Sequence, residues 1–215
     1  MNLPVLYPIL DVSGDSGDRE QRRPRALAHL LCQAGCTWLQ LRHKNGDSAV
    51  TLDLARNLVA ELTPLGGRLI VNDRLDIALL AGAAGVHLGQ NDLPIAAARQ
   101  LARPPFVIGV STHDPEEAAA AEAAGADYIG FGPMFATGSK ADALTTPRSL
   151  ELLAATRRRT RLPIVAIGGI NLERAGPILT RGADAVAMIS ALSRAEAPLV
   201  LTRAILALPR AGNFR

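Results

Sequence analysis

Short apolar runs recur along the chain, each followed by a polar or glycine-containing loop and then by an alanine- and leucine-rich segment with helical spacing. Strand-length apolar runs alternating with amphipathic segments are typical of parallel β/α units. Strands are predicted at residues 5–10, 38–41, 68–71, 85–88, 106–110, 128–131, 164–167 and 185–188. Helices are predicted at residues 25–34, 49–62, 115–124, 149–156, 172–181 and 198–208, with short crossovers at 75–81 and 93–101.

Eight continuously hydrophobic strands in one chain of 215 residues favour a closed (β/α)8 TIM barrel over an open doubly wound sheet. A flavodoxin-like sheet would need fewer strands. The length suits one well-buried core, so residues 1–215 are predicted to form a single domain, of the α/β class. Similar Gly-Ala phrases recur before the fourth, sixth and eighth strands, where a helix must end and hand over to the next strand.

The composition argues against a membrane protein, an exported protein and a disulfide or zinc site. Hydrophobic residues make up 48% and charged residues 20%, and no apolar run approaches the roughly 18 residues of a membrane span, so we expect a soluble protein with no membrane partner. The first ten residues lack a basic leader and a small-residue cleavage site, which predicts a cytoplasmic location. Cys32 and Cys36 are the only cysteines, and their spacing fits the buried face of a helix better than a disulfide or zinc site.

The charge pattern argues against nucleic-acid binding. Net charge is only +3, aromatic residues are 3% of the chain, and the one basic cluster, at 157–161, ends a predicted helix, where it favours the helix dipole. We therefore expect no nucleic-acid partner. The sequence leaves a homo-oligomer open.

Polar residues gather directly after the predicted strands. In a TIM barrel, these positions share one mouth and carry the ligand-binding groups. The residues after strands two to five are Gln40, Arg42, Lys44, Asn72, Asp73, Arg74, Gly89, Gln90, Asp92, Ser111 and His113.

The loop after the sixth strand is dense in glycine and hydroxyl groups. Gly130 and Gly132 permit close backbone approach to a ligand, Thr137 and Ser139 offer donors, and Lys140 supplies positive charge, so this loop is predicted to hold a phosphate. The alternative is an ordinary glycine-rich connection.

A second anion site is predicted at Gly168–Gly169 and Ile189–Ser190, after strands seven and eight, where such barrels often bind phosphate through backbone amides. A simple glycine turn is the competing interpretation. Two anion sites imply two phosphorylated substrates, or one long one.

Asp73 and Asp92 are the candidate metal ligands, because adjacent loops can bring both carboxylates to one magnesium ion that also bridges to a substrate phosphate. The alternatives are that Asp73 pairs with Arg74 or Arg42, and that Asp92 caps the segment beginning at Leu93.

The histidines receive no catalytic role. His87 lies within a predicted strand and is interpreted as a packed core residue, whereas His43 and His113 have no carboxylate partner evident from the sequence.

Taken together in this order, the motifs closely resemble those of the thiamine-phosphate synthase family, over nearly the whole chain. The matching segments are residues 40–44 (QLRHK), 72–76 (NDRLD), 85–92 (GVHLGQND), 111–113 (STH), 132–140 (GPMFATGSK), 166–170 (AIGGI) and 186–190 (VAMIS).

The resemblance implies a magnesium-dependent transferase that joins 4-amino-2-methyl-5-hydroxymethylpyrimidine diphosphate to 4-methyl-5-(2-phosphoethyl)thiazole, giving thiamine phosphate and diphosphate. By the same resemblance, Lys140, Ser111 and Arg42 would be catalytic, and Asp73 and Asp92 would hold Mg²⁺. The implied ligands of the pyrimidine diphosphate are Gln40, Leu41, Arg42, His43, Lys44, Asn72, Ser111 and Lys140. Those of the thiazole phosphate are Thr137, Gly138, Ser139, Gly169, Ile189 and Ser190.

Two departures from the family pattern stand out. Ser139 replaces the usual threonine and keeps its hydroxyl, and segment 141–148 is unlike the usual continuation. The related thiazole tautomerase typically has histidine at the position of Pro133 and lacks the diphosphate ligands. A non-catalytic barrel that senses a thiamine precursor would not require those ligands either.

Overall fold

Eight strands form the centre of the molecule, and the computed structural model describes residues 3–12, 18–136 and 146–210. The strands are β1 (Leu6–Asp11), β2 (Trp38–Arg42), β3 (Arg68–Asn72), β4 (Gly85–Leu88), β5 (Val107–Thr112), β6 (Tyr128–Phe131), β7 (Ile164–Ala166) and β8 (Ala185–Met188). Each pairs in parallel with the next in chain order, and β8 pairs with β1 to close the barrel. The predicted single-domain TIM barrel is confirmed.

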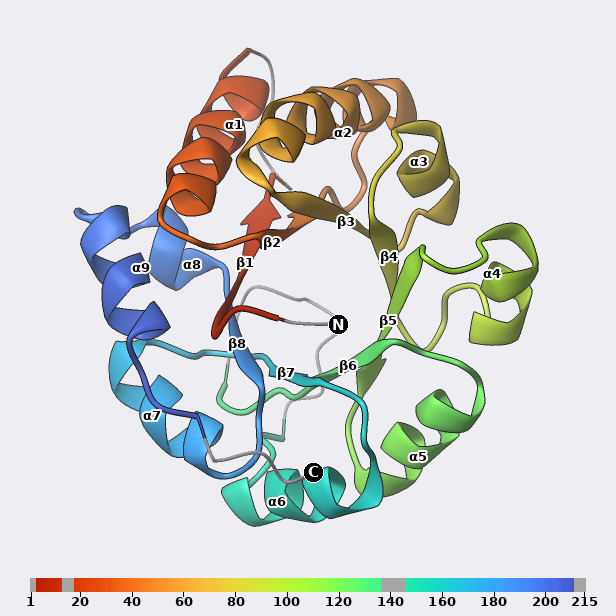
Figure 1. Ribbon diagram of the computed structural model, residues 1–215, viewed down its shortest axis with the longest axis vertical. Coiled ribbons are helices and arrows are strands. Elements are labelled where there is room, and N and C mark those ends of the chain that lie inside the picture. The colour runs from red at the N-terminus through yellow and green to blue at the C-terminus, as the bar shows by residue number, and fades with distance from the viewer. Residues whose placement is uncertain (1–2, 13–17, 137–145, 211–215) are drawn as a thin grey trace.

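Helices surround the barrel on its outer side (Figure 1). They are α1 (Asp18–Gln33), α2 (Ser48–Leu62), α3 (Leu75–Leu80), α4 (Ile95–Leu101), α5 (Pro115–Ala123), α6 (Leu150–Arg159), α7 (Leu172–Thr180), α8 (Ser190–Ser193) and α9 (Pro198–Leu206), with a 3₁₀ turn η1 (Thr63–Leu65) after α2. Most match the predicted ranges within a few residues. Helix α1 begins at Asp18 rather than residue 25, because its polar first turns carry no apolar periodicity to reveal them.

The strands alternate between two separate cores. Leu39 and Leu41 of β2 are fully buried in the core between barrel and helices, whereas Trp38 belongs to the cluster inside the barrel. Because successive strand side chains point to opposite faces, Gln40 and Arg42 share the interior face with Trp38. This alternation carries polar side chains from the barrel interior to its mouth.

Glycines end several helices, as the repeated phrases predicted. Gly82 and Gly125 follow α3 and α5 with φ values of 68° and 90°, in the left-handed region that glycine adopts without steric cost. These glycines are structural and lie apart from the candidate site.

Other features agree with the sequence. Cys32 and Cys36 are free and buried, and burial raises the pKa of Cys36 to about 12. The arginines at 157–159 form the last turn of α6. Among the helices in the described part of the chain, none is both long and apolar enough to cross a membrane.

Candidate active site

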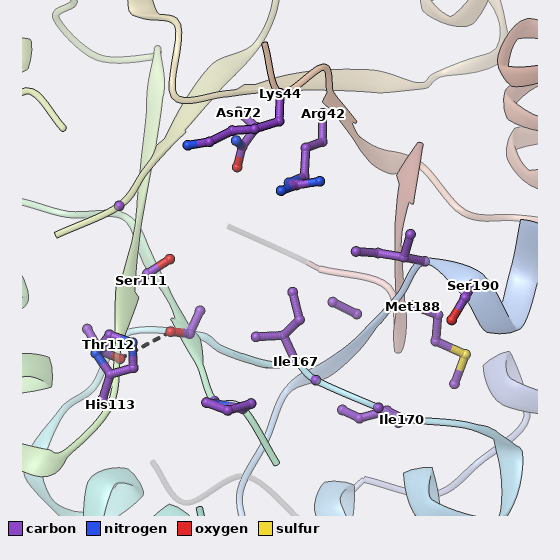
Figure 2. A pocket seen from close by; sticks show the side chains of 18 of the residues that line it. Arg42, Lys44, Asn72, Ser111, Thr112, His113, Ile167, Ile170, Met188 and Ser190 are labelled. Atoms are coloured by element: carbon purple, nitrogen blue, oxygen red, sulfur yellow. Dashed lines mark hydrogen bonds between the residues drawn. The ribbon is translucent and has the colours of Figure 1, made fainter. Parts of the chain in front are cut away.

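A cavity of about 900 Å³ opens at the carboxyl ends of the strands, a size typical of small-molecule sites. Figure 2 shows Arg42, Lys44 and Asn72 on one side of it and Met188 and Ser190 on another. The predicted site residues that line it are Arg42, Lys44, Asn72, Asp73, Asp92, Ser111, Gly169, Ile189 and Ser190.

Three predicted substrate ligands lie away from the cavity lining. Leu41 is fully buried in the outer core, so its side chain packs under the helices rather than toward a ligand. His43 Nδ1 lies 2.8 Å from Thr51 Oγ1, at the start of α2, and its ring lies beside Gly46. The Gln40 side chain is buried inside the barrel, where it donates to the Tyr7 hydroxyl at 3.4 Å. The roles of Leu41 and His43 as substrate ligands stay predictions.

Four predicted ligands, Thr137, Gly138, Ser139 and Lys140, lie outside the described residues. Their roles stay predictions.

Arg42 is anchored from the neighbouring strand. It pairs with Asp11 in the register between β1 and β2, and its Nη1 donates to Asp11 Oδ2 at 2.6 Å. The Arg42 side chain is 8% exposed, and among the described residues no atom accepts a hydrogen bond from its Nε. A buried guanidinium with an unused donor beside a cavity suits a substrate anion.

Asp73 follows β3 in a strained turn. Its φ is 63°, a left-handed conformation that is uncommon for a residue with a Cβ, and the turn is closed by a 2.7 Å hydrogen bond from Arg74 N to Asn72 O. The Asp73 backbone N also donates to His87 O at 2.8 Å. Such backbone strain is often found at functional sites.

The electrostatics of Asp73 are those of a crowded carboxylate. Burial raises its pKa, and the Asp92 carboxyl, within hydrogen-bonding reach, raises it further. Lys44, with Nζ 3.4 Å from Asp73 Oδ2, acts in the opposite direction but only in part. The loops after β3 and β4 therefore bring two carboxylates together, as predicted.

The alternative interpretations of these aspartates are not what the structure shows. Arg74 pairs with Asp76 at 2.6 Å, and Arg42 pairs with Asp11. Helix α4 starts at Ile95, whereas Asp92 Oδ2 accepts from the backbone N of Gly89 at 2.6 Å.

The carboxylate pair fits a hard divalent cation. Negative charge is concentrated on Asp73 and Asp92, and the attraction of Lys44 does not offset the raised pKa of Asp73. Within the described ranges, no cluster of three or more His, Cys, Asp or Glu side chains could hold a metal. A cation here would fill its other positions with water or substrate oxygens, as Mg²⁺ characteristically does.

The opposite wall is built on the glycine pair after β7. Gly168 has φ 104°, and a Cβ there would lie 2.6 Å from Pro133 Cβ; Gly169 has φ 61°, and its Cβ would lie 2.7 Å from Ala136 O. The absence of side chains at Gly168 and Gly169 lets the loops after β6 and β7 pack directly together. A simple glycine turn would not need this close contact.

Gly130 and Gly132 also make room for neighbouring protein atoms. A Cβ on Gly130 would come within 3.0 Å of His87 Cε1, and one on Gly132 would overlap Ile167 O. Both glycines line the cavity, and their approach to a ligand stays a prediction.

Several residues near the cavity escaped sequence reasoning. Arg174 and Arg194 line it; Arg174 Nη1 donates to Gly169 O at 2.6 Å, and its guanidinium lies 4.3 Å from the centroid of Phe135. Arg174 follows the glycine pair closely, in the first turn of α7, and this spacing could have indicated that it lies near the mouth.

His113 does have a carboxylate partner: its Nδ1 lies 2.9 Å from Glu117 Oε2, an i, i+4 pair that the sequence could have revealed.

Comparison with known proteins identifies related sequences along nearly the whole chain. Residues 6–192 match the family described as thiamine monophosphate synthase. A thiamine-phosphate synthase of Chlorobium luteolum is 44% identical over 210 residues, covering 97% of this chain and 95% of that protein. One from Methanocella arvoryzae is 48% identical over 192 residues, covering 89% and 90%.

Solved structures give a parallel result. A thiamine phosphate pyrophosphorylase from Pyrococcus furiosus superposes with a TM-score of 0.82 at 33% identity, covering 95% of this chain and 94% of that one. A 3-hexulose-6-phosphate synthase superposes with a TM-score of 0.69 at 18% identity, a likeness of fold alone.

Proposed function

The chain belongs to the thiamine monophosphate synthase family, and from that premise we propose that it makes thiamine phosphate. Its substrates would be 4-amino-2-methyl-5-hydroxymethylpyrimidine diphosphate and 4-methyl-5-(2-phosphoethyl)thiazole. The bond between the pyrimidine methylene carbon and the diphosphate oxygen breaks, and its electron pair leaves with diphosphate. The lone pair of the thiazole nitrogen then forms the new carbon–nitrogen bond.

One observation carries the proposal: a single cavity holds a carboxylate pair beside buried and exposed cations on one wall and a glycine-built wall opposite. The first wall suits a diphosphate with its metal, and the second suits a single phosphate. Their shared cavity would place the reacting methylene carbon of one substrate beside the thiazole nitrogen of the other.

Diphosphate departure requires charge neutralisation rather than a protein nucleophile, because the electron-rich aminopyrimidine can stabilise a cation at its methylene carbon. Arg42 and Lys44, which line the cavity, would bind the leaving group's oxygens. The hydrogen bond to Asp11 already holds the Arg42 guanidinium in position. Less movement of this side chain would therefore be needed as negative charge develops on the departing diphosphate. Lys140 is proposed as a third cation there.

Mg²⁺ is the proposed cofactor, with Asp73 and Asp92 as its protein ligands. When bound, it would neutralise charge on the diphosphate. The concentrated negative charge at the carboxylate pair supports this assignment.

Neutral polar groups would hold the pyrimidine. Asn72 lines the cavity beside Arg42 and Lys44, and Ser111 lines it at another point (Figure 2), so both could direct hydrogen bonds to the ring or its substituents. The buried Gln40 lies deeper, in contact with Tyr7. We propose that Gln40 supports this part of the cavity from inside the barrel.

The thiazole phosphate is assigned to the opposite wall. Gly169, Ile189 and Ser190 line it, and the left-handed backbone at Gly169 helps shape a surface for an anion. Arg174 and Arg194 add positive charge to this side of the cavity. We propose that Thr137, Gly138 and Ser139 complete the site. Cytoplasmic location and assembly into a homo-oligomer stay predictions.

The direct test supplies both substrates to the purified protein, with magnesium or with EDTA, and measures thiamine phosphate and diphosphate together. We expect equal amounts of the two products, formed only with magnesium. Product formation at full rate in EDTA would contradict the metal assignment, and absence of both products would contradict the proposed reaction.

A further inference from the structure

A continuous chain of hydrogen-bonded side chains crosses the inside of the barrel and ends at Ser111. Gln40 Nε2 donates to the Tyr7 hydroxyl at 3.4 Å, and the Tyr7 and Tyr128 hydroxyls lie 2.9 Å apart. The Tyr128 hydroxyl lies 3.0 Å from His87 Nδ1, and His87 Nε2 lies 3.0 Å from Ser111 Oγ. Five different strands, β2, β1, β6, β4 and β5, contribute one side chain each.

The interior of the barrel is shaped around this chain. Tyr7 and Tyr128 are 1% and 0% exposed, and Gln40 and His87 are buried. Gly109 leaves the space that the Tyr128 ring fills, and Gly130 leaves space for His87. Barrel interiors are usually filled by branched apolar side chains, and burying polar groups is costly unless each is hydrogen-bonded. His87 is a buried residue of β4, as the sequence predicted, and it also belongs to this hydrogen-bonded chain.

The donors and acceptors in the chain have a defined direction. An amide nitrogen can only donate, so Tyr7 accepts from Gln40. Burial raises the pKa of Tyr7 to about 12 and that of Tyr128 well above 10, so both hydroxyls keep their protons. The described partners of the Tyr7 hydroxyl are Gln40, which donates to it, and Tyr128. Tyr7 therefore donates to Tyr128, and Tyr128 donates to His87 Nδ1.

We infer that this chain fixes His87 as the neutral Nε2–H tautomer, which donates to Ser111 Oγ and leaves the Ser111 hydroxyl to donate its own proton into the cavity. Ser111 lines the cavity, so its proton is available to an acceptor atom of the pyrimidine diphosphate. His87 is then a positioning residue, and the site is specific for a substrate that presents an acceptor at that point. The substrate part of this inference rests on the proposed function.

The tautomer can be measured without any substrate. The chain has four histidines, so two-bond ¹H–¹⁵N correlation spectra of ¹⁵N-labelled protein at pH 7.5 can be assigned with a His87→Gln variant. We expect His87 to show a protonated Nε2 and an unprotonated, hydrogen-bonded Nδ1. A protonated Nδ1 with a bare Nε2 would reverse the chain and overturn the inference, as would an imidazolium. This result does not depend on the synthase reaction.

A double-mutant cycle tests the effect on catalysis. Tyr128→Phe keeps the ring and His87 but removes the hydroxyl that donates to Nδ1. We expect a roughly five- to tenfold loss of kcat/KM for the pyrimidine diphosphate, the size of one neutral hydrogen bond, with the KM for the thiazole phosphate unchanged. In a Ser111→Ala background, the same substitution should cost nothing further.

The outcomes of the cycle separate a positioning role of Tyr128 and His87 from a purely structural one. Fully additive losses in the double variant, or equal losses for both substrates, would assign Tyr128 a merely structural role and overturn the positioning inference. His87→Gln, which retains a donor, should keep more activity than His87→Ala; equal activity would count against a donated hydrogen bond. If the wild-type protein formed no thiamine phosphate, the proposed reaction would fail while the spectra still tested the tautomer.

Discussion

Asp11 and Arg42 form a 2.6 Å ion pair between the ends of β1 and β2, directly opposite one another in the barrel register. Arg42 lines the cavity, whereas Asp11 is not among the residues that line it. The pair therefore connects the first strand of the barrel to the group proposed to bind the diphosphate.

Asp11→Asn should weaken this positioning while leaving the charge of Arg42 in place. We expect kcat/KM for the pyrimidine diphosphate to fall roughly tenfold to a hundredfold, the range of one charge-assisted hydrogen bond. Arg42→Lys should cost at least as much, because an ammonium cannot reproduce the guanidinium fork. Steady-state kinetics with each substrate varied in turn measures both effects.

A matched control is available on the outer surface. Arg25 and Glu61 form a comparable ion pair between α1 and α2, each about one-third exposed. Glu61→Gln should leave the kinetics of both substrates unchanged. A similar kinetic loss in Glu61→Gln would show that general destabilisation, not positioning of Arg42, explains the Asp11 result.

Asp73→Asn should separate stability from activity. The raised pKa of Asp73 means that the folded protein disfavours the charged form of this carboxyl. Its contribution to folding stability is therefore fully present below its unfolded pKa, near 4. That contribution is lost as the pH rises through the pKa of Asp73 in the folded protein. In EDTA at pH 7.5, the variant's Tm should equal or exceed that of the wild type, and the advantage should shrink toward pH 4. Asparagine also tolerates the left-handed backbone of this position.

With magnesium present, we expect the wild type rather than Asp73→Asn to have the higher Tm. Magnesium should raise the Tm of the wild type by binding the folded state, but not that of Asp73→Asn, whose activity should fall by roughly a hundredfold or more. Asp76→Asn is the control: Arg74 lowers the pKa of Asp76, so its effect on stability has the opposite sign. An Asp73→Asn variant that keeps normal magnesium-dependent activity would rule out the ligand role.

Gly168→Ala should damage one wall of the cavity. The new methyl group would meet Pro133 at 2.6 Å in a backbone conformation that alanine rarely adopts. We expect a loss of about 1–3 kcal/mol in the free energy of unfolding, together with a raised KM for the thiazole phosphate. Denaturant unfolding and steady-state kinetics measure the two effects separately.

Gly125→Ala separates the effect of backbone strain from the effect of the contact that Gly168→Ala makes with Pro133. Gly125 has a similar φ of 90°, but nothing lies within 4 Å of its Cβ position. This variant should lose stability with little change in KM. If both variants raised KM equally, the contact between the loops after β6 and β7 would not be what shapes the phosphate wall.

The sequence was sufficient for the barrel because each strand is a local apolar run with a nearby helix. Three strands, β4, β6 and β8, have the predicted bounds, and the mouth brings together Asp73, Asp92 and Ser111 as expected. These inferences needed only the order of the elements and the rule that strand ends share a mouth.

Contacts between distant strands were beyond sequence reasoning. Tyr7 and Tyr128 are 121 residues apart, and nothing in the local pattern around either residue shows that their hydroxyls meet. Asp11 was missed for the same reason, since its partner is determined by the barrel register. Leu41 shows a second limit: the side chain of a residue inside a site motif can lie in the outer core, because alternate strand residues point away from the barrel interior.

The cavity is proposed to bind two phosphorylated substrates on opposite walls. This assignment is tested by calorimetric titration of each substrate into Arg42→Gln and Ser190→Ala, with magnesium present. We predict that Arg42→Gln weakens the pyrimidine diphosphate at least tenfold with little effect on the thiazole phosphate, and that Ser190→Ala does the reverse. If each substitution weakened both substrates equally, or neither, the assignment of the two walls would be contradicted.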